Sequence, residues 1–142
     1  MAPSHVLVPL DGSPLAEDAL AYALDVFDCP VTVLNVVSPV DASMSESGAL
    51  ATEEDRLDEA RERAESIVEP AGDGESRGRD VDVVVETGEP AETIVDYVAA
   101  TDVDQVVMGG HGGERSAVAR RLLGTVATKV VGETPVTVTV VR

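Results

Sequence analysis

The chain has 142 residues, with 27 Asp and Glu against 10 Lys and Arg, and a formal net charge of −17 at pH 7. A chain of this length can bury roughly two-thirds of its unfolded surface in one core, and its one cysteine, Cys29, excludes an internal disulfide. The negative charge argues against binding to nucleic acid or an anionic membrane, because both attract Lys and Arg. Carboxylates occur in every segment, which we interpret as adaptation to a high-salt cytoplasm, with an ordinary acidic protein as the alternative.

The N-terminal residues MAPSHVLVPLDGS lack a basic segment followed by a long apolar one. No apolar run in the chain approaches the ~20 residues that span a bilayer. We therefore expect a soluble, cytoplasmic protein. The sequence contains no CxxC motif and no Cys/His cluster, so no structural metal is expected.

Apolar runs of strand length alternate with segments whose apolar residues recur at helical spacing. The predicted strands are 5–10, 31–37, 81–86, 104–108 and 135–141. The predicted helices run from Pro14 to the Cys29-Pro30 stop, over 53–69, over 91–100, and through a helical pattern that ends near Val131. Residues 38–52 have loop composition and are long enough to serve as a mobile flap.

This alternation through the whole chain predicts one α/β domain over residues 1–142, with a five-stranded parallel sheet and helices on both faces. In such sheets ligands bind beyond the carboxyl ends of the strands, where the strand order reverses. The loops that begin at Asp11, Val37, Gly88 and Gly109 are therefore the candidate binding loops.

Glycines gather in the segment MGGHGGERSAVARRLLGTVATKVV, residues 108–131. The first four are Gly109, Gly110, Gly112 and Gly113. Glycine lets the backbone approach a ligand closely and present its N–H groups to an anion. Further on, Gly124-Thr125 begins a helical stretch whose N–H donors and hydroxyl could bind a phosphate. The alternative is a tight strand-to-helix turn followed by a helix with a threonine cap.

The same region is a basic island in an acidic chain. Residues 105–132 hold four basic residues and one acid, a net charge of +3, so the other 114 residues carry −20. Its charged members are Glu114, Arg115, Arg120, Arg121 and Lys129. This island favours an anionic small ligand, although such residues also occur on ordinary solvated helix faces.

These segments make the chain resemble the universal stress protein family over nearly its full length. The matching stretches are VLVPLDGSPLAEDAL (6–20), VTVLNVV (31–37), GEPAETIVDY (88–97), VVMGGHG (106–112) and LLGTVATKVVGETPVTVTVV (122–141). The resemblance implies a Rossmann-like, adenine-nucleotide-binding α/β fold that is commonly dimeric. The family's ATP-binding branch carries a Gly, two residues, a Gly, nine residues, and then a Gly with Ser or Thr.

Carried over by position, the resemblance implies that Asp11 and Val36 meet the adenine and ribose. It places Met108, Gly109 and Gly112 at the ribose and phosphates, and Gly124, Thr125 and Val126 at the distal phosphates. The full expected nucleotide site is Pro9, Leu10, Asp11, Val36, Met108, Gly109, His111, Gly112, Arg115, Gly124, Thr125 and Val126. The implied cofactor is ATP, and Mg²⁺ could accompany it through Asp11.

The glycine spacing departs from this pattern in one place. Eleven residues, 113–123, separate Gly112 from Gly124, where the family pattern has nine. The two additional residues could bulge outward or could misplace one phosphate-binding element relative to the other. The alternative function is therefore a dimeric interaction protein that binds no nucleotide.

Enzymatic turnover has little support in the sequence. Asp11 could belong to a phosphatase-like start, but Pro9 occupies the position of the nucleophile. His111 could contact a phosphate, whereas His5 begins a strand and is interpreted as structural. No set of nucleophile, base and orienting group is found, so rapid catalysis is not predicted and a slow phosphate-ester hydrolase is the least favoured alternative.

The last predicted strand, PVTVTVV, alternates Val136, Val138 and Val140 with threonines. If it lies at a sheet edge, its unpaired backbone invites association, because it carries no charge before Arg142. We therefore expect a homodimer that forms through this strand. The alternative is a strand covered by the helices of its own chain.

Overall fold

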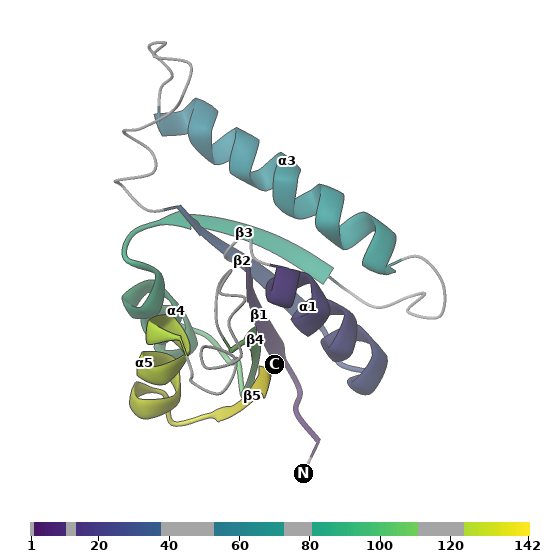
Figure 1. Cartoon of the computed structure of the whole chain (residues 1–142), viewed down its shortest axis with the longest axis vertical. Coiled ribbons are helices and arrows are strands. Elements are labelled where there is room, and N and C mark those ends of the chain that lie inside the picture. The colour runs from purple at the N-terminus through teal and green to yellow at the C-terminus, as the bar shows by residue number, and fades with distance from the viewer. Residues whose placement is uncertain (1, 11–13, 38–52, 73–80, 111–123) are drawn as a thin grey trace.

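The computed structural model describes residues 2–10, 14–37, 53–72, 81–110 and 124–142 (Figure 1). Strands and helices alternate along these residues as predicted. Their order is β1 (Val6–Leu10), α1 (Pro14–Val26), β2 (Val31–Val37), α3 (Glu53–Gly72), β3 (Val81–Thr87), α4 (Pro90–Ala100), β4 (Gln105–Gly109), α5 (Thr125–Glu133) and β5 (Thr137–Val141).

The five strands form one parallel sheet in the order β3-β2-β1-β4-β5, which confirms the predicted fold class. The strand order reverses between β1 and β4, the place where parallel sheets bind ligands. β5 begins at Thr137, two residues later than predicted. Pro135 has no N–H to donate to the ladder, which accounts for the later start.

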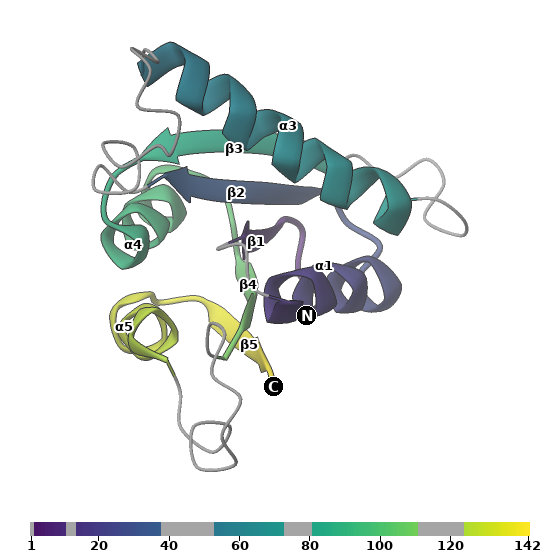
Figure 2. The ribbon, with the colours of Figure 1, turned by 45° about the horizontal axis from the view of Figure 1, so that its top comes forward.

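Two apolar layers hold helices against the sheet. On one face Val8, Leu20 and Val33 are fully buried with α1 and α3, and on the other Leu7, Leu34 and Val130 are fully buried with α4 and α5. Figure 2 shows the two pairs of helices on opposite sides of the strands. Each of these side chains contributes about 1.5–3 kcal/mol when it is fully buried, so both layers stabilise the central strands.

α3 extends past the predicted boundary at residue 69 and ends at Gly72. Pro70 is tolerated because its fixed φ suits a helix and its missing N–H removes one bond only, near the helix end. α3 packs closely through buried Ala60, whose carbonyl accepts a 3.2 Å hydrogen bond from Asn35 Nδ2. Its Arg61 Nη1 donates a 2.9 Å hydrogen bond to the Val83 carbonyl of the edge strand β3.

Candidate functional site

The candidate site lies at the carboxyl ends of β1 and β4, where the strand order reverses. Of the predicted site residues the structure describes Pro9, Leu10, Val36, Met108, Gly109, Gly124, Thr125 and Val126. Asp11, His111, Gly112 and Arg115 lie outside the described residues, as do Arg120, Arg121 and the 38–52 segment interpreted as a flap.

β1 and β4 pair only near their beginnings. The β1–β4 register includes Val6 and Leu7, whereas the pairing of β1 with β2 continues to Leu10. Pro9 lies in the part of β1 that β4 does not pair with, and a proline has no N–H for a sheet ladder. The carboxyl ends of β1 and β4 are therefore not paired with one another at the point of reversal.

Two backbone hydrogen bonds of Gly110 join the end of β4 to the start of α5 and to the end of β5. The Gly110 carbonyl accepts from the Gly124 N–H at 2.5 Å, and the Gly110 N–H donates to the Val141 carbonyl at 2.8 Å. The two residues that flank 111–123 are thus bonded to each other beside the end of β5. The eleven-residue spacing therefore leaves Gly110 and Gly124 in direct contact.

Gly109 has a packing role of its own. A Cβ at this position would lie 2.8 Å from Leu15 Cβ and 3.1 Å from the Leu15 carbonyl carbon on α1. Real Cβ atoms do not approach other heavy atoms this closely, so α1 can pack here only against a glycine. Helix packing accounts for Gly109 without a ligand, and the role at the ribose and phosphates that the resemblance implies for this glycine stays a prediction.

Among the residues that the structure describes, no side chain caps the N-terminus of α5. Gly124 is the N-cap residue, with φ −65° and ψ 165°, and the first turn holds no acidic residue. The first helical hydrogen bond runs from the Thr128 N–H to the Gly124 carbonyl at 2.9 Å, so the N–H groups of Thr125, Val126 and Ala127 precede it. The Thr128 hydroxyl donates to the same carbonyl and caps no N–H. These backbone donors and the helix dipole suit an anion.

α4 begins differently, because it supplies its own anion. The Glu89 carboxylate accepts hydrogen bonds from the Glu92 N–H at 2.7 Å and the Ala91 N–H at 3.2 Å. The Glu92 N–H, helped by that of Ala91 and by the charge of Lys129, lowers the pKa of Glu89 below its ordinary value. The Glu89 side chain therefore caps the N-terminus of α4, whereas the N-cap residue of α5, Gly124, makes no such hydrogen bond.

Lys129 does not contribute a free positive charge to the site. Its Nζ lies 3.4 Å from Glu92 Oε1 and 3.9 Å from Glu89 Oε2. The one basic member of the island that the structure describes is thus paired with two carboxylates of the α4 N-terminus, and the anionic ligand inferred from the island stays a prediction. A surface pair of this kind adds little to stability, but it offsets the charge.

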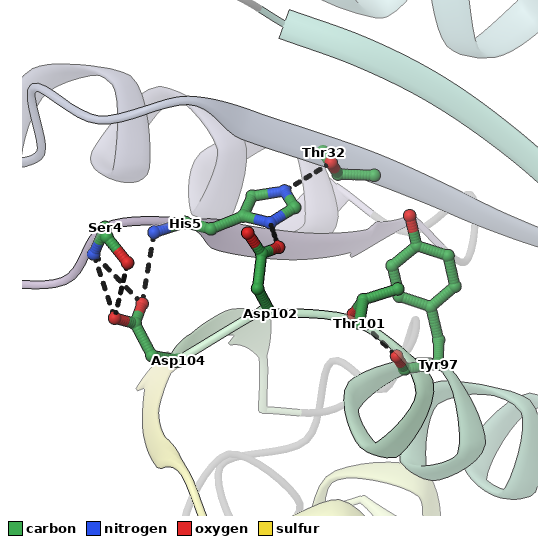
Figure 3. A network of polar contacts seen from close by, with 7 residues as sticks. All are labelled: Ser4, His5, Thr32, Tyr97, Thr101, Asp102 and Asp104. Carbon is green, nitrogen blue, oxygen red and sulfur yellow. Dashed lines mark hydrogen bonds and ion pairs between the residues drawn. The ribbon is translucent and has the colours of Figure 1, made fainter.

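A polar network at the amino ends of the strands, away from the candidate site, holds the beginnings of β1, β2 and β4 together (Figure 3). His5 Nδ1 lies 2.6 Å from Asp102 Oδ1, and His5 Nε2 lies 2.7 Å from Thr32 Oγ1. Asp104 accepts hydrogen bonds from the Ser4 N–H, the Ser4 hydroxyl and the His5 N–H. The hydrogen bond from His5 lowers the pKa of Asp102, and that from the Ser4 N–H lowers the pKa of Asp104.

Thr32, His5 and Asp102 have the hydroxyl–imidazole–carboxylate order of a nucleophilic site. This set is not apparent in the sequence because Thr32 and Asp102 lie 27 and 97 residues from His5. Thr32 is only 3% exposed within the central strand β2, which closes its hydroxyl to a substrate. The arrangement is a structural tie, in agreement with the structural role expected for His5.

Three other expectations concern metals, membranes and Cys29. Among the described residues, no group of three or more His, Cys, Asp or Glu side chains could hold a metal ion. No helix in that part of the chain is long and apolar enough to cross a membrane. Cys29 is half-buried and packs against the core layer of α1 and α3 as a small packing residue.

Taken together, the parallel sheet, the reversal between β1 and β4 and the glycine-flanked start of α5 define a Rossmann-like α/β protein. Residues 3–142 match the family model of the universal stress protein family, so the chain belongs to this family. No curated protein matches the chain.

Solved structures show the same fold. The hypothetical protein MJ0577 is 27% identical, with a TM-score of 0.77 over 97% of this chain and 94% of that one. A universal stress protein in complex with cAMP is 20% identical, with a TM-score of 0.68 over 100% and 98% of the two chains. A universal stress protein from Archaeoglobus fulgidus in complex with dAMP is 21% identical, with a TM-score of 0.64 over 100% of both chains. At 20% and 21% identity, the last two are similar to this chain in fold alone.

Proposed function

We propose that this chain is a cytoplasmic stress-response protein that binds ATP as a regulatory ligand within a homodimer. The observation that carries this proposal is the uncapped N-terminus of α5, held at the end of β4 by the Gly124–Gly110 hydrogen bond. A helix N-terminus of this kind stabilises phosphate through its N–H donors and its partial positive charge. The ligand would lie at the reversal of strand order, the usual place in this class of sheet.

The adenine nucleotide class is supported by similar structures. One universal stress protein of this fold holds cAMP and another holds dAMP. The choice of ATP comes from the glycine motif, whose flanks are in contact in this chain. The proposed site keeps all twelve predicted residues, from Pro9 to Val126, including the four outside the described residues, with Asp11 as the residue that would meet Mg²⁺.

The two sheet edges favour a homodimer through β5. The β3 edge carries Asp82 and Glu86, and its Val83 carbonyl already accepts from Arg61. β5 has no charged residue between Thr137 and Val141 and forms the other edge. Unpaired, uncharged edge strands pair readily with another copy.

The valines predicted for this interface pack against the core of their own chain and also have exposed parts. Val136 and Val138 pack partly against the core layer of α4 and α5, and Val140 is half-buried. The backbone of β5 would therefore make the pairing. The exposed flanks of Val136, Val138 and Val140 would add apolar contact to it.

The experiment is to purify the protein in concentrated KCl, denature it, and identify any released nucleotide by mass spectrometry. The stripped protein is then titrated with ATP and Mg²⁺. Stoichiometric ATP, or saturable binding at micromolar concentration, is the expected result. Neither nucleotide nor binding would contradict the proposal.

A dimeric interaction protein that binds no nucleotide is the second candidate. The packing of Leu15 against Gly109 favours it, because this contact explains one motif glycine without a ligand. A dimer in sedimentation analysis, together with no ATP binding, would select this candidate.

A further inference from the structure

Three large apolar side chains are exposed among the residues that the structure describes. They are Tyr22 and Val26 on α1, with 41% and 48% of their surface exposed, and Val131 on α5, with 46% exposed. α1 and α5 cover opposite faces of the sheet, and both contact β5. Figure 2 shows β5, the edge strand of the proposed homodimer, between these two helices. The exposed apolar side chains therefore belong to helices that border this edge.

Val131 lies on the flank of α5 that faces away from α4. Lys129 marks the opposite flank, because its Nζ lies 3.4 Å from Glu92 Oε1 on α4. Two residues along an α-helix turn the side-chain direction by about 200°, so Val131 points away from α4. α4 contacts β2, which is separated from β5 by β1 and β4. The Val131 side chain therefore points toward the outer side of β5.

Tyr22 and Val26 lie on the flank of α1 that faces β4 and β5. Leu15 marks this flank, because a Cβ at Gly109 of β4 would lie 2.8 Å from Leu15 Cβ. Tyr22 and Val26 follow Leu15 by about two and three helical turns, so all three share one side of the helix. α3 lies on the other side of α1, over β2 and β3. The exposed apolar flanks of α1 and α5 thus border the same sheet edge from its two faces.

The charge and the size of this edge favour a second copy of the chain as its partner. With a net charge of −17, two copies repel each other least where the surface carries no charge. β5 has no charged residue between Thr137 and Val141, and Thr128, about one turn before Val131, adds none. A strand of this length spans only about 17 Å, and its edge buries far less than the roughly 800 Å² per partner of a stable interface. A dimer through β5 therefore needs surface beside the strand.

We propose that the second copy covers the flanks of α1 and α5 together with β5, so that Tyr22, Val26 and Val131 are interface residues. This inference rests on the proposed function, because it concerns the same homodimer. A two-fold axis perpendicular to the sheet pairs the two β5 strands antiparallel, and each helix then faces its own counterpart across the interface. The strands contribute backbone hydrogen bonds, and the apolar flanks contribute the burial that the strands lack.

The test measures the dimer dissociation constant by sedimentation velocity at one fixed KCl concentration. We expect Val131→Glu and Val26→Glu to raise this constant at least about tenfold, because each places a charge in an apolar contact. The control for α5 is Gly132→Glu, which adds the same charge at the next residue, where a Cβ has nothing within 4 Å. The control for α1 is Ala21→Glu, at an exposed position on another side of that helix. Both controls should dimerise like the wild type, and circular dichroism checks that all four variants are folded.

The contrary results separate this inference from the dimer itself. If the wild-type protein is a monomer at every concentration, the proposed homodimer fails and this inference fails with it. If the wild type is a dimer and the flank variants dimerise as tightly as their controls, the flanks lie outside the interface while the dimer stands. Equal losses in the flank variants and the controls would also overturn the inference, because they would reflect net charge alone. A loss in only one flank variant would overturn the proposal for the other flank.

Discussion

The N–H of Gly124 and the carbonyl of Gly110 form a backbone hydrogen bond across the segment whose length departs from the family pattern. Because the bond joins the two flanks directly, the number of residues between them does not set their separation. Loop-closure entropy also grows slowly with length, so two more residues cost only a few tenths of a kcal/mol by the logarithmic law. Insertions in this segment are compatible with a phosphate site built from its flanks.

Replacing Gly124 by Val should lower ATP affinity by at least about tenfold while the protein stays folded. The backbone at Gly124 has φ −65° and ψ 165°, which a branched residue adopts without strain, but the added methyl groups would obstruct the first N–H groups of α5. Calorimetry with ATP checks the affinity, and circular dichroism checks the fold. The control is Gly132→Val in the same helix, where a Cβ has nothing within 4 Å. Undiminished affinity in Gly124→Val would show that the ligand does not use this helix end.

Replacing Gly109 by Ala should lower the free energy of unfolding by about 1–3 kcal/mol, the usual cost of overpacking. The new Cβ would meet Leu15 Cβ at 2.8 Å and the Leu15 backbone at 3.1 Å, so α1 would have to shift on β4. Urea denaturation in concentrated KCl measures the change. Gly132→Ala, at an open helical position, should instead be neutral or stabilising by up to about 1 kcal/mol. A Gly109→Ala protein as stable as the wild type would contradict the packing role of this glycine.

The Asp104→Asn variant should be less stable than the wild type at neutral pH, and the difference should disappear in acid. The N–H of Ser4 holds the pKa of Asp104 below its ordinary value of 3.8. A lowered carboxyl pKa stabilises the fold above the unfolded value, and this contribution is lost as the pH falls through the folded pKa.

Urea midpoints measured from pH 7 down to below 3.8 follow this difference between wild type and Asp104→Asn. Asp82→Asn, which removes an exposed carboxylate from β3, is the control for net charge. A difference between wild type and Asp104→Asn that stays constant across the pH range would mean that the hydrogen bonds to Asp104 do not distinguish its charged form.

Replacing Thr137 by Lys should weaken the proposed dimer by at least about tenfold, because charged residues on an edge strand oppose pairing between copies. Thr137 is exposed at the beginning of β5. Sedimentation velocity over a range of protein concentrations measures the dissociation constant. Asp82→Lys, on the opposite sheet edge, should leave the oligomeric state unchanged. If Asp82→Lys dissociates the dimer and Thr137→Lys does not, then the copies pair through β3.

The fold could be predicted from the sequence because each strand is a short apolar run and each helix has its own periodicity. β1 is buried at every position, as its uninterrupted run of apolar residues VLVPL indicates. The helix stop predicted at Pro70 is wrong, because a proline near a helix end removes few hydrogen bonds and α3 continues to Gly72. The position of β5 at an edge could be stated only as a condition, because strand order depends on which strands pair.

The candidate site could be located but not resolved into roles. The glycines predicted a close approach of the backbone, but the approach at Gly109 is that of Leu15. Lys129 enters the predicted basic island as one of its positive charges, whereas the structure pairs it with Glu92, which lies 37 residues earlier in the sequence. Contacts of this kind depend on how α4 and α5 lie beside each other, which residue periodicity does not specify.

The two unlike edges of the sheet set a limit on growth. A sheet whose two edge strands can both pair with another copy can add copies repeatedly and form a fibre. Here the edge strand β3 carries Asp82 and Glu86, and its Val83 carbonyl accepts a hydrogen bond from Arg61. Two copies that pair through β5 would therefore expose only their β3 edges, which do not favour pairing with a third copy. An assembly built from this chain would therefore stop at two, and its solubility at high concentration would follow from the placement of a few charges on β3.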